Sequence, residues 1–417
     1  MTEQRDIVIA GGGMVGISLA LHLGQWLPDS ARILLVEGFP FPQASGAKPP
    51  EYHPSFDARS TALSYSSRLI YEQLGLWQQL ETWLCPIETI HVSSRGRFGS
   101  ALLEAADYQW PALGYVVENA WLGSALAQAL LAQGRVEVMS PARVESAEPH
   151  GDGVRLSLGG DAPLTTIDAA LLVVADGADS GLRGQLGVIA SEKPYGQQAL
   201  IANIATAQPH QGCAFERFTD EGPLALLPLG PAPGAEHRSA LVWTLPPARA
   251  QELLHCDETT FLQELQSRFG YRLGRLRQVS ERHGYPLALV ESAEQVRQGI
   301  VVMGNAAHAL HPVAGQGFNL ALRDVAALAR RVADAVDAGT SPGELATLQA
   351  YERAQRADQE RTIGFSDKVP ALFMQTDPIL GLGRDMALAG LDFLPGLKAE
   401  FVRYAAGVAD LELSDHG

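Results

Sequence analysis

The sequence IVIAGGGMVG, at residues 7–16, carries the strongest indication of the fold of this chain. An apolar strand runs directly into the pattern G-x-G-x-x-G, formed by Gly11, Gly13 and Gly16, and a helical pattern follows. In a dinucleotide-binding βαβ unit, the first glycine permits a tight turn and the second lets the pyrophosphate approach the backbone. The third allows the helix to pack closely on the strand. The stretch therefore predicts a nucleotide site at the start of the chain.

The second strand of this unit is expected at residues 32–36, and it ends at Glu37. An acidic residue about twenty positions after the glycines accepts hydrogen bonds from the ribose hydroxyls of a bound nucleotide. The helix between the two strands presents unpaired N–H groups and the positive end of its dipole to the phosphates. These residues do not separate FAD from NAD, and a glycine-rich turn in an ordinary α/β sheet is the alternative interpretation.

Composition narrows the class of protein. The chain has 417 residues, which exceeds the length that a single hydrophobic core normally accommodates, so we expect two domains. Its net charge of −16 argues against nucleic-acid binding and against strong electrostatic attachment to anionic lipid. The three cysteines, Cys85, Cys213 and Cys256, are far apart and predict free thiols. Neither a signal peptide nor a spanning apolar run is visible, so we expect a cytoplasmic protein, with peripheral membrane contact as an option.

The pattern of apolar residues changes along the chain. Strand-like pieces near 199–204, 213–218, 224–229 and 240–245 are separated by Pro/Gly turns and followed by one helix near 257–270, and they predict an antiparallel sheet. The expected fold class is α/β, with a Rossmann-like nucleotide-binding domain and an inserted antiparallel-sheet substrate domain. We assign residues 1–75, 100–182 and 286–365 to the first domain, 76–99 and 183–285 to the second, and 366–417 to a C-terminal helical segment.

Further segments fall where predicted strands meet loops, which is where open α/β sheets bind ligands. Residues 58–64 read ARSTALS, residues 175–180 read ADGADS, and residues 303–319 contain MGNAAH followed by GQGFN. The backbone of the GQG sequence precedes a predicted helix, whose N–H groups and dipole stabilise negative charge. The candidate site residues in these segments are Arg59, Asp176, Gly304, Asn305, Gly315, Gln316, Gly317 and Asn319.

With these motifs, residues 6 to about 365 resemble the group A flavoprotein monooxygenases, which have the para-hydroxybenzoate hydroxylase fold. Within that family the chain is most similar to the ubiquinone-biosynthesis hydroxylases, in particular the 2-polyprenyl-6-methoxyphenol type. The resemblance implies FAD as the nucleotide and NAD(P)H as co-substrate. It also implies that Glu37 binds the adenosine ribose, that Arg59 contacts the flavin, and that residue 305 meets a ribityl hydroxyl. The family usually has aspartate at that position, whereas Asn305 matches the methoxyphenol branch.

The resemblance suggests further roles near the cofactor. Asp176 would order water or accept N–H groups near the pyrophosphate, because a carboxylate does not bind phosphate directly without cost. The backbone of residues 315–317 would face the pyrimidine edge of the flavin. Arg183 is a candidate contact for the nicotinamide nucleotide, with a plain surface role as the alternative. His308 and His311 lack a third ligand at suitable spacing, so we expect no metal site.

The activity implied is hydroxylation of a prenylated phenol with O2, through a flavin hydroperoxide, in ubiquinone biosynthesis. No side-chain nucleophile is needed, and the sequence does not identify a base. Three alternatives stay open: a sister hydroxylase acting at another ring position, an FAD-dependent prenyl reductase that does not use O2, and a non-catalytic scaffold. Other ubiquinone-biosynthesis proteins are candidate partners. Residues 369–405 are rich in Leu, Phe, Met and Pro, and they suggest a membrane or partner contact or a packed helix.

Overall fold

A computed structural model of the chain describes residues 3–41, 52–96, 100–160, 165–311, 315–374, 400, 402–403 and 406–408. The βαβ unit predicted at the N-terminus is present. It consists of β1 (Glu3–Ala10), α1 (Met14–Trp26) and β2 (Ile33–Val36). The chain as a whole mixes α-helices with β-sheets, which confirms the expected fold class.

The first sheet contains eight strands within the described residues, in the order β18-β19-β11-β1-β2-β8, with β10 and β9 following from β11. Strands β19, β11, β1, β2 and β8 are parallel. Their apolar runs are buried on both faces, as is typical of parallel sheets. The remaining bounds are β8 (Val136–Met139), β9 (Ala142–His150), β10 (Gly153–Gly160), β11 (Thr165–Val174), β18 (Val296–Arg297) and β19 (Ile300–Val302).

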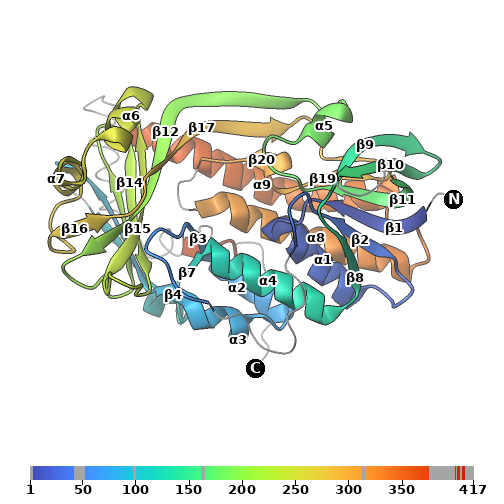
Figure 1. Cartoon of the computed structure of the whole chain (residues 1–417), viewed down its shortest axis with the longest axis horizontal. Helices are drawn as coiled ribbons and strands as arrows, with labels where there is room; N and C mark the ends of the chain where they lie inside the picture. The colour runs from blue at the N-terminus through green and yellow to red at the C-terminus, as the bar shows by residue number, and fades with distance from the viewer. Residues whose placement is uncertain are drawn as a thin grey trace.

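Helices cover one face of this sheet. Because side chains alternate along a strand, Ile7 and Ile9 of β1 point to the side packed by α1, α4 (Asn119–Gln133) and α8 (Gln316–Asp337). Val8 and Ala10 point to the opposite side, where they join a core with β9, β10 and α5 (Gly181–Gln185). Figure 1 shows α1, α4 and α8 gathered beneath β1 and β2.

The second sheet has nine strands within the described residues, in the order β20-β17-β12-β15-β14-β13-β5-β6, with β16 beside β12. It is antiparallel except for the β5–β13 pair, and the expected strands near 199–204, 213–218, 224–229 and 240–245 all belong to it. The bounds are β5 (Thr89–Ser94), β6 (Ser100–Glu104), β12 (Ala190–Thr206), β13 (Cys213–Phe218), β14 (Pro223–Leu229), β15 (Arg238–Leu245), β16 (Leu276–Val279), β17 (His283–Ser292) and β20 (His308–Ala309).

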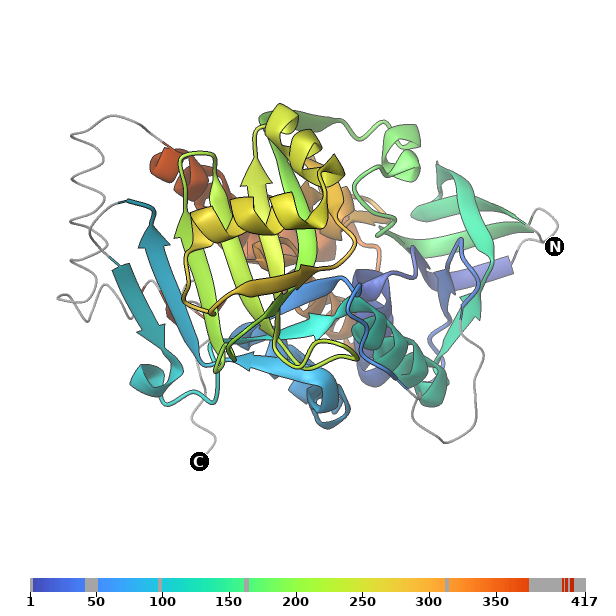
Figure 2. The ribbon, with the colours of Figure 1, turned by 60° about the vertical axis from the view of Figure 1, so that its left-hand side comes forward.

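Two helices, α6 (Pro247–His255) and α7 (Glu258–Phe269), lie across one face of the second sheet (Figure 2). The prediction of a single helix near 257–270 is therefore incomplete. The start of α6 carries a recognisable signal, since Pro247 stands in the first turn, where proline is favoured. Ala250 and Leu253 bury its inner face against the sheet.

A small third sheet, in the order β3-β7-β4, lies with α2 and α3 between the two larger sheets. Long strands β12 and β17 run from the second sheet toward α5 (Figure 1). The remaining bounds are β3 (Ser60–Ser64), β4 (Leu84–Ile87), β7 (Gly114–Glu118), α2 (Tyr65–Gln73), α3 (Trp77–Leu80), α9 (Leu345–Met374) and the 3₁₀ turns η1 (Glu81–Trp83), η2 (Ala105–Tyr108) and η3 (Gly304–Ala306).

The domain limits stated above remain a proposal. Strand β6 pairs with β5 in the second sheet, and helix α9 continues through residue 366. The segment 369–405, with its suggested membrane or partner contact, lies largely outside the described residues. Among the helices that are described, none combines the length and the apolar character needed to cross a bilayer.

Candidate functional site

Four parallel strands of the first sheet end in one row. Their last residues pair side by side, in the order Val36, Ala10, Val174 and Val302. The chain continues this alignment one residue further, since the Gly11 N–H donates to the Val36 carbonyl at 2.9 Å. Because the carboxyl ends of these strands meet at one edge, the four motifs that follow them lie side by side.

In the glycine loop after β1, two of the three motif glycines have no room for a side chain and the third has room for one. A Cβ at Gly11 would lie 2.4 Å from the Ala175 carbonyl oxygen, and Gly11 has φ +115°. A Cβ at Gly16 would lie 1.9 Å from the Gly11 carbonyl oxygen. By contrast, a Cβ at Gly13 would meet nothing within 4 Å. Packing of the chain itself therefore requires Gly11 and Gly16, whereas Gly13 borders open space.

That open space lies at the N-terminus of α1. Gly13 is the N-cap residue, none of the described side chains caps the helix, and its first turn contains no acidic residue. The first N–H groups of a helix without such partners attract an anion, and the helix dipole adds to this attraction. The shape and the charge of this end of α1 therefore fit a pyrophosphate, as the sequence predicts.

Glu37 is held at the same edge by backbone groups. Its Oε2 accepts a hydrogen bond from the Gly12 N–H at 2.6 Å, and its Oε1 accepts one from the Phe39 N–H at 2.8 Å. A carboxylate oxygen has two acceptor sites, so each oxygen retains capacity for a ribose hydroxyl. Gly12, which we did not single out, is needed here, because a Cβ would lie 2.8 Å from the Glu37 Cβ.

The motifs after β11 and β19 are tied together by an arginine. Asp176 is exposed at the end of β11, and Asn305 is exposed within η3 after β19. Between these segments, half-buried Arg183 of α5 donates from Nη1 to the Ala306 carbonyl at 2.7 Å. Arg183 therefore joins α5 to the turn that carries Gly304 and Asn305, a contact that neither of our interpretations included.

The N-terminus of α8 is a second helix end at the site. Gly315, with φ +61°, is its N-cap residue, none of the described side chains caps it, and the first turn lacks acidic residues. Gln316 is buried, and Gly317 is half-buried. These features fit the predicted stabilisation of an anion by backbone N–H groups. The preceding residues 312–314 lie outside the described part of the chain.

Asn319 anchors this loop instead of offering free hydrogen-bonding groups. Its Oδ1 accepts from the Ser64 N–H at 2.8 Å and from the Ser67 hydroxyl at 2.7 Å. Its Nδ2 donates to the Gly315 carbonyl at 2.8 Å and to the Ala62 carbonyl at 2.9 Å. An asparagine side chain makes at most about four hydrogen bonds, and all four are used. Asn319 thus holds the start of α8 against β3.

Arg59 reaches across to the second sheet. Its Nη1 donates to the hydroxyl of Tyr285 on β17 at 3.0 Å, in an exposed contact. Strand β3 begins directly after Arg59, and the anchored loop at Gly315 lies against Ala62 of that strand. The structure therefore brings the ARSTALS and GQGFN segments together, although more than 250 residues separate Ala62 from Asn319.

The two histidines of the MGNAAH region are buried, at 7% exposure for His308 and 1% for His311. Burial lowers the pKa of both imidazoles to about 4, so both are neutral at pH 7. The His311 ring stands edge-on to Tyr195, with 5.1 Å between ring centroids. Burial and the neighbouring Asp367 carboxylate raise the pKa of Tyr195. Over the described residues, no cluster of three His, Cys, Asp or Glu side chains could hold a metal.

All three cysteines are free thiols, as predicted. Burial raises the pKa of Cys85 and of Cys213 to about 11, so neither is a thiolate at neutral pH.

The chain is similar to known proteins both in sequence and in fold. The sequence profile of the FAD binding domain family matches residues 47–366. The chain is 34% identical to the ubiquinone hydroxylase UbiL of Rhodospirillum rubrum, over 97% of this chain and 90% of the relative. It is 31% identical to the 3-demethoxyubiquinol 3-hydroxylase of Escherichia coli, over 98% and 100%. The crystal structure of p-nitrophenol 4-monooxygenase PnpA from Pseudomonas putida shares the fold, with a TM-score of 0.74 at 18% identity over 97% and 99% of the chains.

Proposed function

Since this chain belongs to the FAD binding domain family of FAD-dependent monooxygenases, we propose that it hydroxylates the ring of a prenylated phenol in ubiquinone biosynthesis. The observation that carries the proposal is the single edge at which the glycine loop, Glu37, Asp176 and Gly304 follow aligned strand ends. The names of the relatives in Rhodospirillum rubrum and Escherichia coli support the substrate class.

The residues at this edge suit each part of FAD. The open space at Gly13 and the N-terminus of α1 would take the pyrophosphate, and Glu37 would accept the ribose hydroxyls. Exposed Asn305 would meet the ribityl chain, and Arg59 would contact the flavin ring. When bound, FAD supplies the acceptor for the hydride of NAD(P)H and the centre that activates O2. The N-terminus of α8 would stabilise negative charge at the pyrimidine edge.

The second sheet offers an apolar surface for the substrate. Leu200, Ala202 and Ile204 of β12 pack beneath α6 and α7, so the alternate residues point to the other face. On that face Ile201 of β12 is half-buried and pairs with half-buried Val242 of β15. Aliphatic side chains suit an aromatic ring with a prenyl tail, and they help to exclude water from the reacting centre.

Two ring positions are the main candidates. The asparagine at position 305 supports the 2-polyprenyl-6-methoxyphenol substrate. The name of the Escherichia coli relative, a 3-demethoxyubiquinol 3-hydroxylase, supports a sister reaction at another position. Mass spectrometry of prenyl-quinone lipids from the source cell with this gene deleted separates them. Accumulation of a prenylated methoxyphenol supports the first, and accumulation of a demethoxyquinol supports the second.

An unchanged lipid profile would overturn the substrate proposal and leave the flavin site standing. Complementation should succeed with the intact gene and fail with Gly13→Val. With purified protein, O2 consumption coupled to NAD(P)H oxidation distinguishes a hydroxylase from a prenyl reductase, which uses no O2. Bound, reducible FAD argues against a non-catalytic scaffold.

A further inference from the structure

The segment that precedes Arg59 is held by a buried asparagine from the other sheet. Asn203 of β12 is 3% exposed, and its Nδ2 group donates both hydrogens to this segment. One goes to the Phe56 carbonyl at 2.8 Å and the other to the Ala58 carbonyl at 2.7 Å. The Ala58 carbonyl belongs to the peptide group that links Ala58 to Arg59. Asn203 therefore fixes the backbone from which the Arg59 side chain starts.

A buried ion pair holds the same segment a few residues earlier. Arg238 of β15 and Glu118 of β7 form a salt bridge with side chains 2% and 5% exposed. Arg238 Nη1 also donates to the Ser55 carbonyl at 2.6 Å, and Glu118 Oε2 accepts from the Ser55 N–H at 3.3 Å and from the Tyr52 hydroxyl. Both charged side chains therefore hold the segment that leads to Arg59 by hydrogen bonds to its residues.

We propose that Asn203 and the Arg238–Glu118 pair are positioning residues that orient Arg59 for the cofactor. Through them, strands β12 and β15 of the second sheet would be connected to the flavin site. The inference rests on the proposed contact between Arg59 and FAD. Ordering a backbone segment costs conformational entropy, so a backbone that the protein already holds in place lowers the entropy lost when Arg59 engages a ligand. A buried ion pair contributes little net stability compared with apolar packing, which makes a positioning role a testable reason for its presence.

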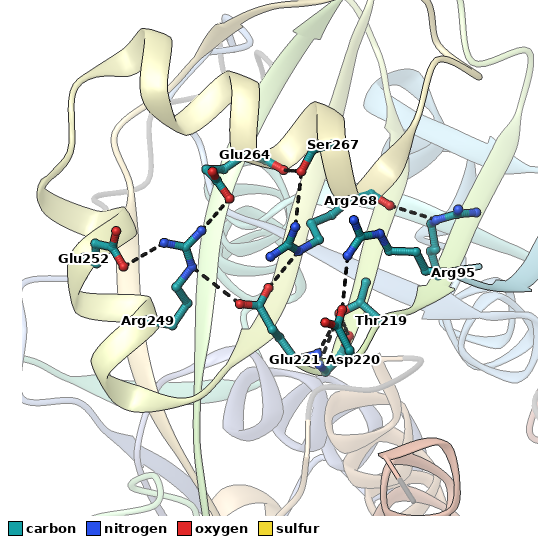
Figure 3. A network of polar contacts seen from close by, with 11 residues as sticks. Arg95, Thr219, Asp220, Glu221, Arg249, Glu252, Glu264, Ser267 and Arg268 are labelled. Atoms are coloured by element: carbon teal, nitrogen blue, oxygen red, sulfur yellow. Dashed lines mark hydrogen bonds and ion pairs between the residues drawn. The ribbon is translucent and has the colours of Figure 1, made fainter. Parts of the chain in front are cut away.

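The far face of the same sheet offers a matched control. There Glu221 lies between Arg249, at 3.5 Å, and Arg268 of α7, at 2.9 Å, as Figure 3 shows. This network joins α6 and α7 to the turn between β13 and β14, and over the described residues its hydrogen bonds and ion pairs do not reach residues 52–59. Arg268→Met and Arg238→Met make the same chemical change on opposite faces of the sheet.

The test measures FAD binding to the full chain after the cofactor has been stripped. Asn203→Leu keeps the shape of the side chain but removes both donors, and it should weaken FAD binding about tenfold. Arg238→Met should weaken FAD binding to a similar extent. Arg268→Met should leave the Kd for FAD within about twofold of the parent value, even where thermal unfolding of the FAD-free protein shows that it costs as much stability.

A pH series separates positioning from general destabilisation. In Asn203→Asp the buried carboxylate would face two carbonyl oxygens, and burial raises the pKa of such a group. Once protonated, it can donate one hydrogen bond to the segment. The Kd of Asn203→Asp relative to the parent should therefore improve several-fold between about pH 8.5 and about pH 6. Asn203→Leu cannot titrate, so its Kd relative to the parent should stay constant.

Two results would overturn the inference. One is parent-like FAD binding by both Asn203 variants across the pH series while Arg59→Ala weakens it. The other is an equal loss of FAD affinity in Arg268→Met and Arg238→Met, which would mean that the effect is only global stability. Parent-like FAD binding by Arg59→Ala is a different result, because it removes the proposed contact between Arg59 and the flavin.

Discussion

A substitution at Gly13 should affect binding of FAD far more than stability of the fold. Its backbone, with φ −73° and ψ 178°, is accessible to any L-residue, and a Cβ there meets nothing within 4 Å. Gly13→Val should therefore fold. Valine is a poorer N-cap residue than glycine, so we expect the free energy of unfolding of the FAD-free protein to fall by at most about 1 kcal/mol.

The same substitution should remove most of the affinity for FAD. The valine methyl groups would fill the space beside the first N–H groups of α1, where the pyrophosphate is expected. Losing one charge-assisted hydrogen bond costs about 1.5–3 kcal/mol. That range corresponds to a Kd raised roughly tenfold to a hundred-and-fifty-fold.

The assay combines the flavin content of the purified protein with a titration of the stripped protein and a urea unfolding curve without FAD. Gly13→Ser is the control, because serine is a favoured N-cap residue. It should keep or raise the stability of the FAD-free protein while still weakening FAD binding. Full flavin occupancy in Gly13→Val would refute the pyrophosphate assignment. Unfolding of Gly13→Val without FAD would refute the conclusion that Gly13 borders open space.

Three further predictions concern the loop and a buried acid. Gly16→Ala should lower the free energy of unfolding by about 1–3 kcal/mol, because its Cβ would lie 1.9 Å from the Gly11 carbonyl oxygen; a parent-like urea midpoint would contradict this. Glu37→Ala should weaken FAD binding by about 1–3 kcal/mol in a titration, and an unchanged Kd would remove Glu37 from the site. Burial raises the pKa of Asp324 to about 7, above its unfolded value, so this group destabilises the fold increasingly as pH rises from about 4 to above 7. Asp324 Oδ1 accepts a hydrogen bond from Gln359 Nε2 at 3.0 Å, and Asp324→Asn keeps an oxygen acceptor for it. The free energy of unfolding of this variant, relative to that of the parent, should grow between about pH 5 and about pH 8. A difference in urea midpoint between variant and parent that is the same at both pH values would count against the raised pKa.

Much of the fold was predictable because its signals are local. The βαβ unit and the central antiparallel strands of the second sheet follow from apolar periodicity and from glycine positions. Helix α6 was missed although its proline start is a local signal too. Asn203 also left a trace, since it is a polar residue in a run of otherwise apolar strand residues, whereas Arg238 stands beside polar residues at the start of β15. Such a residue signals a buried polar contact, but its partner is not visible in the sequence.

Local sequence predicts where the chain turns, which strands are buried and which residues follow their ends, because periodicity and turn chemistry act over a few residues. How those residues are used depends on the tertiary structure. The fold leaves space for a side chain at Gly13, whereas it packs backbone atoms against Gly11 and Gly16. It also directs all four hydrogen bonds of the Asn319 side chain to groups within the protein. It also joins Asn203 to Ala58, 145 residues away. Such partners depend on how sheets pack against each other, and that packing has no local signature.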